Sequence, residues 1–179
     1  MTLKYKGTYK AISPVPGLRE IGAIIKLTAK PSILFQQLLL SKALPVPSAE
    51  VSLLIDTGAS ITSVDESIIR QMQLQALGRM EVTGVSGVPE KRWLYRMCLE
   101  ITLQDDAIGI KKALNFEVVV MGIPQMKDPF GVFSDGLFGL DFIKFFDFNY
   151  SGPGGTWELS LPILPTDPGS KKKNKKKRT

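Results

Sequence analysis

The sequence has no histidine and only one cysteine, Cys98, among its 179 residues. Without histidine, the chain cannot use a Ser-His or Cys-His nucleophile pair, a histidine general base or a histidine-ligated zinc ion. A single thiol can form neither an internal disulfide bond nor a cysteine zinc cluster. The available chemistry therefore depends on carboxylates, hydroxyls, amines and backbone dipoles, and we expect no metal ion and no other cofactor.

Long apolar runs are also missing from the sequence. The apolar stretches around 33–40 and 118–121 are short or interrupted by polar residues, whereas a bilayer crossing needs ~20 predominantly apolar residues. The first six residues lack the apolar region of a secretory signal peptide. These features predict no transmembrane segment and a cytoplasmic location.

The net charge of +6 is distributed unevenly along the chain. The run 171–178 holds seven of the 23 basic residues, which leaves 16 basic residues (23 − 7) against 17 acidic ones in the whole chain. Because the body is close to neutral, it is not typical of a nucleic-acid-binding domain. We expect residues 165–179 to form a disordered basic tail, either a solvated appendage or a contact for nucleic acid, an acidic partner or an anionic membrane surface.

Most apolar residues lie in short β-branched runs separated by turn residues. This pattern predicts a mostly β single domain over residues 19–164, with one or two short helices and an irregular lead-in at 1–18. Asp65 and Asp141 are each placed to cap a short helix, and the connection 31–48 could hold a helical turn or two. The expected strands are 20–29, 50–55, 61–64, 80–85, 93–103, 115–121, 148–150 and 156–161.

The most informative segment is LLIDTGAS, residues 53–60. An acidic residue that follows three large apolar residues emerges from a buried strand, where an unpaired charge costs several kcal/mol. Gly58 permits a tight turn there, and Thr57 offers a hydroxyl to brace it. Most Asp-Thr-Gly tripeptides are ordinary turns, so the alternative for Asp56 is a purely structural turn residue.

Three further features follow this segment in a recognisable order. They are a glycine-bearing hairpin at 82–88, an apolar strand at 116–121 and the segment DGLFGLDF at 135–142. With them, the sequence resembles the retropepsin-like aspartic proteases over roughly residues 20–162. The resemblance implies a single-domain acid-protease barrel in which the hairpin 82–88 is a flap. Ser60 and Leu140 replace an acidic residue and an arginine that pair in retroviral members, so the chain is more similar to the cellular and bacterial branch.

The resemblance also implies a mechanism that needs two carboxylates sharing one proton. The ionised carboxylate takes a proton from a water molecule, which attacks the peptide carbonyl, while the protonated carboxylate donates to the carbonyl oxygen. The chain holds one Asp-Thr-Gly, and Ser134-Asp135-Gly136 has the wrong order to be a second. A symmetric homodimer would bring two copies of Asp56 together on its two-fold axis.

The chain is thus expected to be an aspartic-type endopeptidase with Asp56, Thr57 and Gly58 as its catalytic loop. Thr57 would brace the two loops across the axis, and an extended peptide or protein substrate would lie beneath the flaps. The alternative is a non-proteolytic binding or dimerisation module with the same fold. The expected substrate-binding residues are Ala59, Ser60, Gly84, Val85, Ser86 and Gly87.

Overall fold

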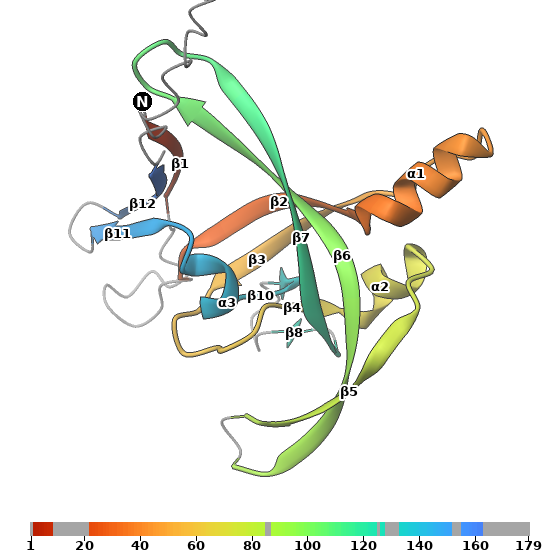
Figure 1. Cartoon of the computed structure of the whole chain (residues 1–179). Helices are drawn as coiled ribbons and strands as arrows, with labels where there is room; N and C mark the ends of the chain where they lie inside the picture. Colours follow the sequence, from red (N-terminus) through yellow and green to blue (C-terminus); the bar gives the residue numbers. More distant parts are fainter. Residues whose placement is uncertain are drawn as a thin grey trace, which may run out of the picture.

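The computed structural model describes residues 2–8, 22–84, 87–124, 126–127, 133–151 and 155–162. These residues form a mostly β domain with three short helices and a closed barrel of six strands (Figure 1), which confirms the fold class expected from the sequence. The helices are α1 (Ile33–Ser41), α2 (Glu66–Gln71) and α3 (Leu140–Ile143). The strands are β1 (Thr2–Thr8), β2 (Ile24–Pro31), β3 (Ala49–Ile55), β4 (Ser63–Asp65), β5 (Ala76–Thr83), β6 (Pro89–Asp105), β7 (Lys111–Ile123), β8 (Met126–Lys127), β9 (Phe133–Ser134), β10 (Gly136–Phe138), β11 (Asp147–Ser151) and β12 (Thr156–Pro162).

The barrel closes because β6 pairs with β2 on one side and with β7 on the other. From β2 the ring continues through the antiparallel pair β2–β3, the parallel pair β3–β10, the antiparallel pair β10–β4 and the parallel pair β4–β7. Strand β10 therefore lies between β3 and β4, the strands that precede and follow the loop 56–62. This order brings the segment 135–142 next to Asp56.

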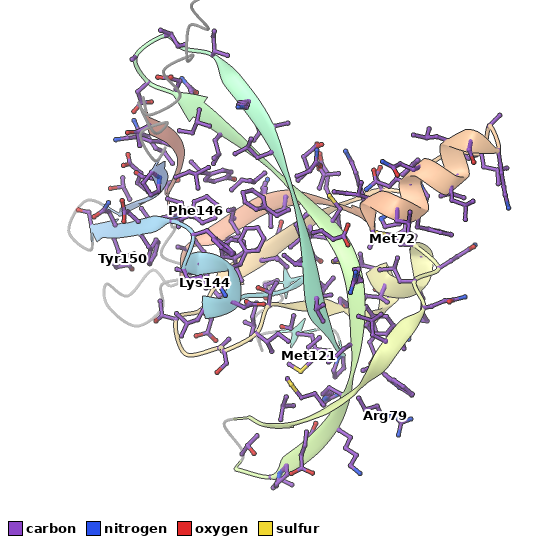
Figure 2. All side chains as sticks on the ribbon, viewed as in Figure 1. Met72, Arg79, Met121, Lys144, Phe146 and Tyr150 are labelled. Carbon is purple, nitrogen blue, oxygen red and sulfur yellow. The ribbon has the colours of Figure 1, made fainter. Side chains whose placement is uncertain are left out.

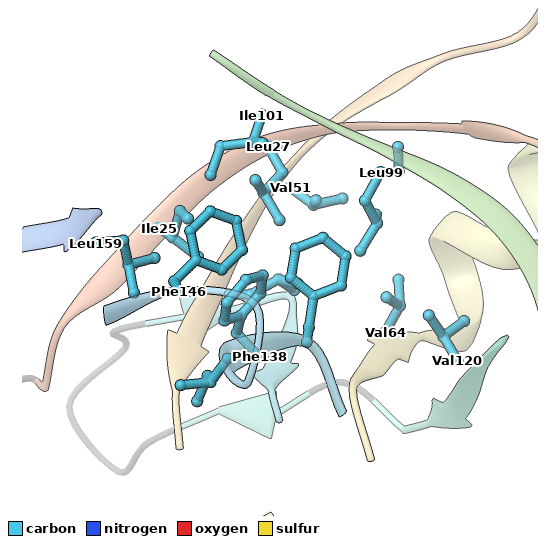
Figure 3. Close-up of a cluster of buried hydrophobic side chains, with 14 of the residues drawn as sticks. Ile25, Leu27, Val51, Val64, Leu99, Ile101, Val120, Phe138, Phe146 and Leu159 are labelled. Carbon is cyan, nitrogen blue, oxygen red and sulfur yellow. The ribbon is translucent and has the colours of Figure 1, made fainter. Parts of the chain in front are cut away.

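The core of the barrel consists of side chains that alternate along each strand. Ile25 of β2, Leu53 of β3 and Leu99 of β6 are fully buried, as the two-residue period of a strand with one face inward requires. Figure 3 shows how such residues from different strands meet the phenylalanines at one end of the barrel. There the rings of Phe138 and Phe142 lie 4.6 Å apart between centroids, which fixes α3 beside β10.

Helix α2 follows its expected sequence signals. The carboxylate of Asp65 accepts a hydrogen bond from the backbone N–H of Ser67 at 2.6 Å, so Asp65 is the N-cap as predicted. Ile69 and Met72 are buried against the core, and Met72 lies close to α2 in Figure 2. By contrast, α1 fills more of the connection 31–48 than the expected turn or two, and none of its residues is buried.

The first residues correct one expectation from the sequence. Residues 2–8 are not irregular, because they form β1, which pairs along its whole length with β12 and at Leu3 and Lys4 with β6. Leu3 is buried while Lys4 and Lys6 face solvent, an alternation that the high charge of the segment conceals. The outer domain limits at 19 and 164 stay predictions, and the basic tail lies outside the described residues.

One finding concerns membranes. Among the residues that the structure describes, no helix is both long enough and apolar enough to span a bilayer.

Candidate active site

Asp56 is the first residue after β3, in a tight turn. Its carboxylate accepts the backbone N–H of Gly58 at 2.8 Å, and the N–H of Ala59 donates to the Asp56 carbonyl at 3.2 Å. A Cβ atom on Gly58 would lie only 3.2 Å from the same carboxylate oxygen, which makes glycine the residue that fits best here. The side chain of Asp56 is half-buried, whereas Thr57, Gly58 and Ser60 are exposed. The turn thus presents an oriented carboxylate at the molecular surface.

Strand β10 and the residue that begins α3 support this turn through backbone hydrogen bonds. The N–H of Asp56 donates to the Phe138 carbonyl at 3.1 Å, and the N–H of Leu140 donates to the Ala59 carbonyl at 2.8 Å. β10 can pass between β3 and the segment 61–64 because Gly136 and Gly139 have no Cβ. A Cβ on Gly136 would collide with the Ser63 carbonyl, and one on Gly139 would lie 2.6 Å from the Ile61 carbonyl carbon. The two glycines therefore set how closely β10 supports the Asp56 turn.

A partly buried polar network, centred on the fully buried Thr62, fixes the far end of the same loop. The Thr62 hydroxyl donates to an Asp141 carboxylate oxygen at 2.7 Å and accepts the N–H of Gly139 at 3.1 Å. The backbone N–H of Thr62 donates to the same Asp141 oxygen at 2.9 Å. The sequence predicted that Asp141 caps a short helix, and this prediction is wrong. The N-cap position of α3 is Gly139, which makes no side-chain capping bond. Instead, Asp141 ties α3 to the end of the Asp56 loop.

The hairpin of β5 and β6 extends from the barrel in Figure 1. The two strands pair as far as Thr83 and Pro89, and the N–H of Gly87 donates to the Gly84 carbonyl at 3.0 Å. Gly87 has a φ of +72°, in the left-handed region that favours glycine. Apart from the neighbouring residues in the chain, no atom of the described residues lies within 4 Å of where a Cβ on Gly84 or Gly87 would be. The turn is thus open on its surroundings, while Val85 and Ser86 lie outside the described residues.

A comparison with known families decides what this arrangement is. The family model described as aspartyl protease matches residues 46–142, which contain the Asp56 turn, the β5–β6 hairpin and β10. The chain belongs to the aspartyl protease family, of the retropepsin-like kind. The chain matches no curated protein sequence.

The mechanism expected from the resemblance needs a second carboxylate, and the other aspartates near the turn form hydrogen bonds elsewhere. Asp135 accepts the N–H of Ser52 at 2.7 Å, while Asp65 caps α2 and Asp141 binds Thr62. No hydrogen bond between described residues joins Asp56 to another carboxylate. The described residues also contain no cluster of three or more acidic or cysteine side chains that could hold a metal ion.

The structure thus brings together some expected site residues of this aspartyl protease and leaves others apart. Asp56, Thr57, Gly58, Ala59 and Ser60 share one turn at the end of β3, whereas Gly84 and Gly87 belong to the separate hairpin turn. Their roles in catalysis and substrate binding stay predictions.

Sequence reasoning missed Thr62 altogether. A threonine directly before a strand carries no special signal. The combination of Thr62 with Asp141, two residues after Gly139, is a pattern that could have indicated this contact. Cys98 is a free, buried cysteine. Burial raises the pKa of its thiol, so this cysteine does not offer an alternative nucleophile.

Proposed function

We propose that this aspartyl protease is an active endopeptidase that works as a homodimer. The observation that carries the proposal is the Asp56 carboxylate, oriented by the N–H of Gly58 at 2.8 Å in a surface turn braced by β10. A structural turn aspartate needs only its bond to the turn. The Thr62–Asp141 network and two closely fitted glycines hold this turn far more rigidly than a simple connection requires, and rigid placement is what a reacting group needs.

The proposed reaction is the hydrolysis of a peptide bond by a water molecule placed between two Asp56 carboxylates. Two carboxylates at close range hold one proton between them, because their like charges oppose double ionisation. The ionised Asp56 takes a proton from the water as the water attacks the carbonyl carbon, and the protonated Asp56 donates its proton to the carbonyl oxygen. Collapse of the tetrahedral intermediate then breaks the C–N bond: the Asp56 that took the water proton donates it to the leaving amine, and the other Asp56 takes back a proton from a hydroxyl of the intermediate, which restores the shared proton.

The surface around the turn supports a second copy as the source of the other carboxylate. Thr57 and Gly58 are exposed, as expected for a loop that would meet its copy. Leu140, whose N–H binds Ala59, is 44% exposed, and Phe145 just after α3 is 50% exposed. Apolar side chains next to a polar catalytic turn are typical of a surface that another chain covers.

The proposed substrate is an extended peptide or protein segment that lies between the Asp56 turn and the β5–β6 hairpin. Ala59 and Ser60 would contact it from the turn, and Gly84, Val85, Ser86 and Gly87 from the flap. The long β6 supports this role, because the hairpin continues well past the barrel and can close over a bound segment to exclude water.

Asp56→Asn tests the proposal with almost no change in shape. The purified variant and the wild type are incubated with a mixed peptide library at several pH values, and cleavage is followed by mass spectrometry. The variant is expected to lose cleavage while keeping its melting temperature, and wild-type activity is expected to fall at a pH too high for the pair to keep its proton. Asp106→Asn, an exposed aspartate in the turn after β6, is the matched control and should remain active.

Three outcomes would contradict parts of this proposal. Equal cleavage by Asp56→Asn and wild type would show that Asp56 is not catalytic. A folded wild type that cleaves no peptide at any pH would favour the non-proteolytic binding module instead. Specific activity that stays constant on dilution, with a monomer in sedimentation, would overturn the dimer. The cytoplasmic location also stays a prediction, which cell fractionation tests.

A further inference from the structure

Helix α1 is an apolar element that the described part of the chain leaves uncovered. It contains no charged residue, and Lys42 is the one charged side chain between residues 31 and 49. None of its nine residues is buried: Leu34 is 76% exposed, Leu40 65% and Leu38 46%. Helices that are apolar on most faces are normally buried. α1 therefore has the composition of a buried helix, although no described part of the chain covers it.

The helix is nevertheless held firmly at its base. The N–H of Ile33 donates to the carboxylate of Glu117 on β7 at 3.2 Å, and the Gln36 side chain donates to the Pro31 carbonyl at 2.7 Å. The hydroxyl of Ser32 caps the first turn by accepting the N–H of Phe35. These bonds fix the direction in which α1 leaves the barrel, and the helix projects away from the body (Figure 2).

An unfilled groove lies beside this base. It has a volume of about 390 Å³ and runs between the first turn of α1 and the connection from α2 to β5. Phe35, Leu74 and Leu77 provide its apolar floor, and Arg96 lies at its edge. The chain thus has an exposed apolar helix and, beside it, an apolar groove large enough to accept side chains from a helix.

We propose that α1 is the contact surface for a second copy of this chain, with the two α1 helices packed antiparallel about a two-fold axis. In that arrangement Leu38, which lies one helical turn after Leu34 on the same face of α1, lies against the groove of the other copy. The contact is isologous, because the same surface serves both partners. It is also separate from the proposed catalytic dimer, and does not depend on it.

The available area and charge fit this occupant. On one side of α1, Leu34, Phe35 and Leu38, with Leu44 and Leu77, present on the order of 500 Å² per copy, which reaches the ~1,000 Å² in total that a specific interface needs. An uncharged helix meets its own copy without like-charge repulsion. The antiparallel arrangement also places Lys42, just after α1, near the end of the other helix where Glu117 lies. A bilayer surface fits less well, since interfacial helices carry a strongly basic polar face that α1 lacks.

The position of α1 makes the consequence for assembly specific. Strand β3 begins after α1 and ends at Ile55, and its seven residues span about 20 Å. The α1 contact and the Asp56 turn therefore lie toward opposite ends of this strand. Two different two-fold contacts on one chain link dimers into tetramers or longer assemblies.

Sedimentation velocity of the full chain over a range of concentrations tests the proposal. The double variant Leu34→Glu with Leu38→Glu should weaken the α1 association at least about a hundredfold, because four buried leucines per contact would be replaced by charges. The matched control is Ile108→Glu with Ile110→Glu in the β6–β7 turn, where the two isoleucines are 59% and 58% exposed. The control should assemble as the wild type does.

The readouts separate this contact from the proposed function. Loss of the larger assembly with peptide cleavage per chain retained supports the α1 contact as a surface distinct from the catalytic dimer. If neither protein cleaves peptides, the difference in assembly alone still supports it. Identical assembly of wild type and double variant overturns the proposal, as does wild-type binding to zwitterionic lipid vesicles that the double variant loses. Leu34→Gln with Leu38→Gln, which adds no charge, should give the same shift if the Glu variant folds poorly.

Discussion

Thr62→Val removes one hydroxyl from the network behind the Asp56 turn and keeps the shape of the side chain. Thr62 is fully buried, and its hydroxyl makes two bonds, to the Asp141 carboxylate at 2.7 Å and from the Gly139 N–H at 3.1 Å. The first bond involves a charged acceptor, and loss of the second leaves a buried N–H without a partner. Together these losses should lower the free energy of unfolding by about 3 kcal/mol. For a chain of this length that corresponds to a fall in melting temperature of roughly 9 °C.

Thermal unfolding followed by circular dichroism measures this effect, beside peptide cleavage below the melting transition. Thr102→Val, the same change at an exposed position of β6, is the control and should shift stability by less than about 0.5 kcal/mol. Asp141→Asn keeps an oxygen that can accept both Thr62 bonds and should cost less than Thr62→Val. A melting temperature for Thr62→Val equal to that of the control would show that the network does not hold the turn.

Two further predictions concern the hairpin turn and the β1 surface. Gly87→Ala and Gly109→Ala introduce a side chain at φ values of +72° and +69° and should each cost roughly 1–2 kcal/mol, but only Gly87→Ala should also reduce peptide turnover; equal turnover in the two variants would argue against a flap. The hydrogen bond from Lys6 lowers the pKa of Asp106, so this pair stabilises the fold above the unfolded-state pKa of Asp106 and loses its effect as the pH falls through the lowered value. Asp106→Asn should therefore melt slightly below wild type at neutral pH and equally in acid, and a difference that persists in acid would contradict this linkage.

The features that the sequence predicted correctly depend on neighbouring residues. The Asp65 cap arises from a capping carboxylate, and the strand before Asp56 arises from an apolar run. The family resemblance, carried by the order of the Asp-Thr-Gly, the glycine hairpin and the Leu-Phe-Gly segment, added the expectation that these elements form a single-domain barrel.

The features that the sequence did not predict depend on distant partners. Asp141 has the local pattern of a helix cap, and only contact with Thr62, 79 residues away, gives it another role. Strand β1 has a sequence that could be irregular, and its pairing with β12 decides its conformation. The length of α1 was missed for another reason. An apolar segment without a clear period can be a loop, a buried strand or a helix, so the sequence does not fix its length.

The pairing of β1 with β12 has a consequence for how the molecule is made. Thr2 pairs with Pro162, so β1 leaves the ribosome well before the strand that pairs with it along its whole length. Until then β1 can use only the short pairing with β6 through Leu3 and Lys4. Contacts so far apart in sequence form slowly. A chain whose synthesis stops before β12 would therefore leave the backbone N–H and C=O groups on one edge of β1 unpaired, and this edge could pair with other unfinished chains.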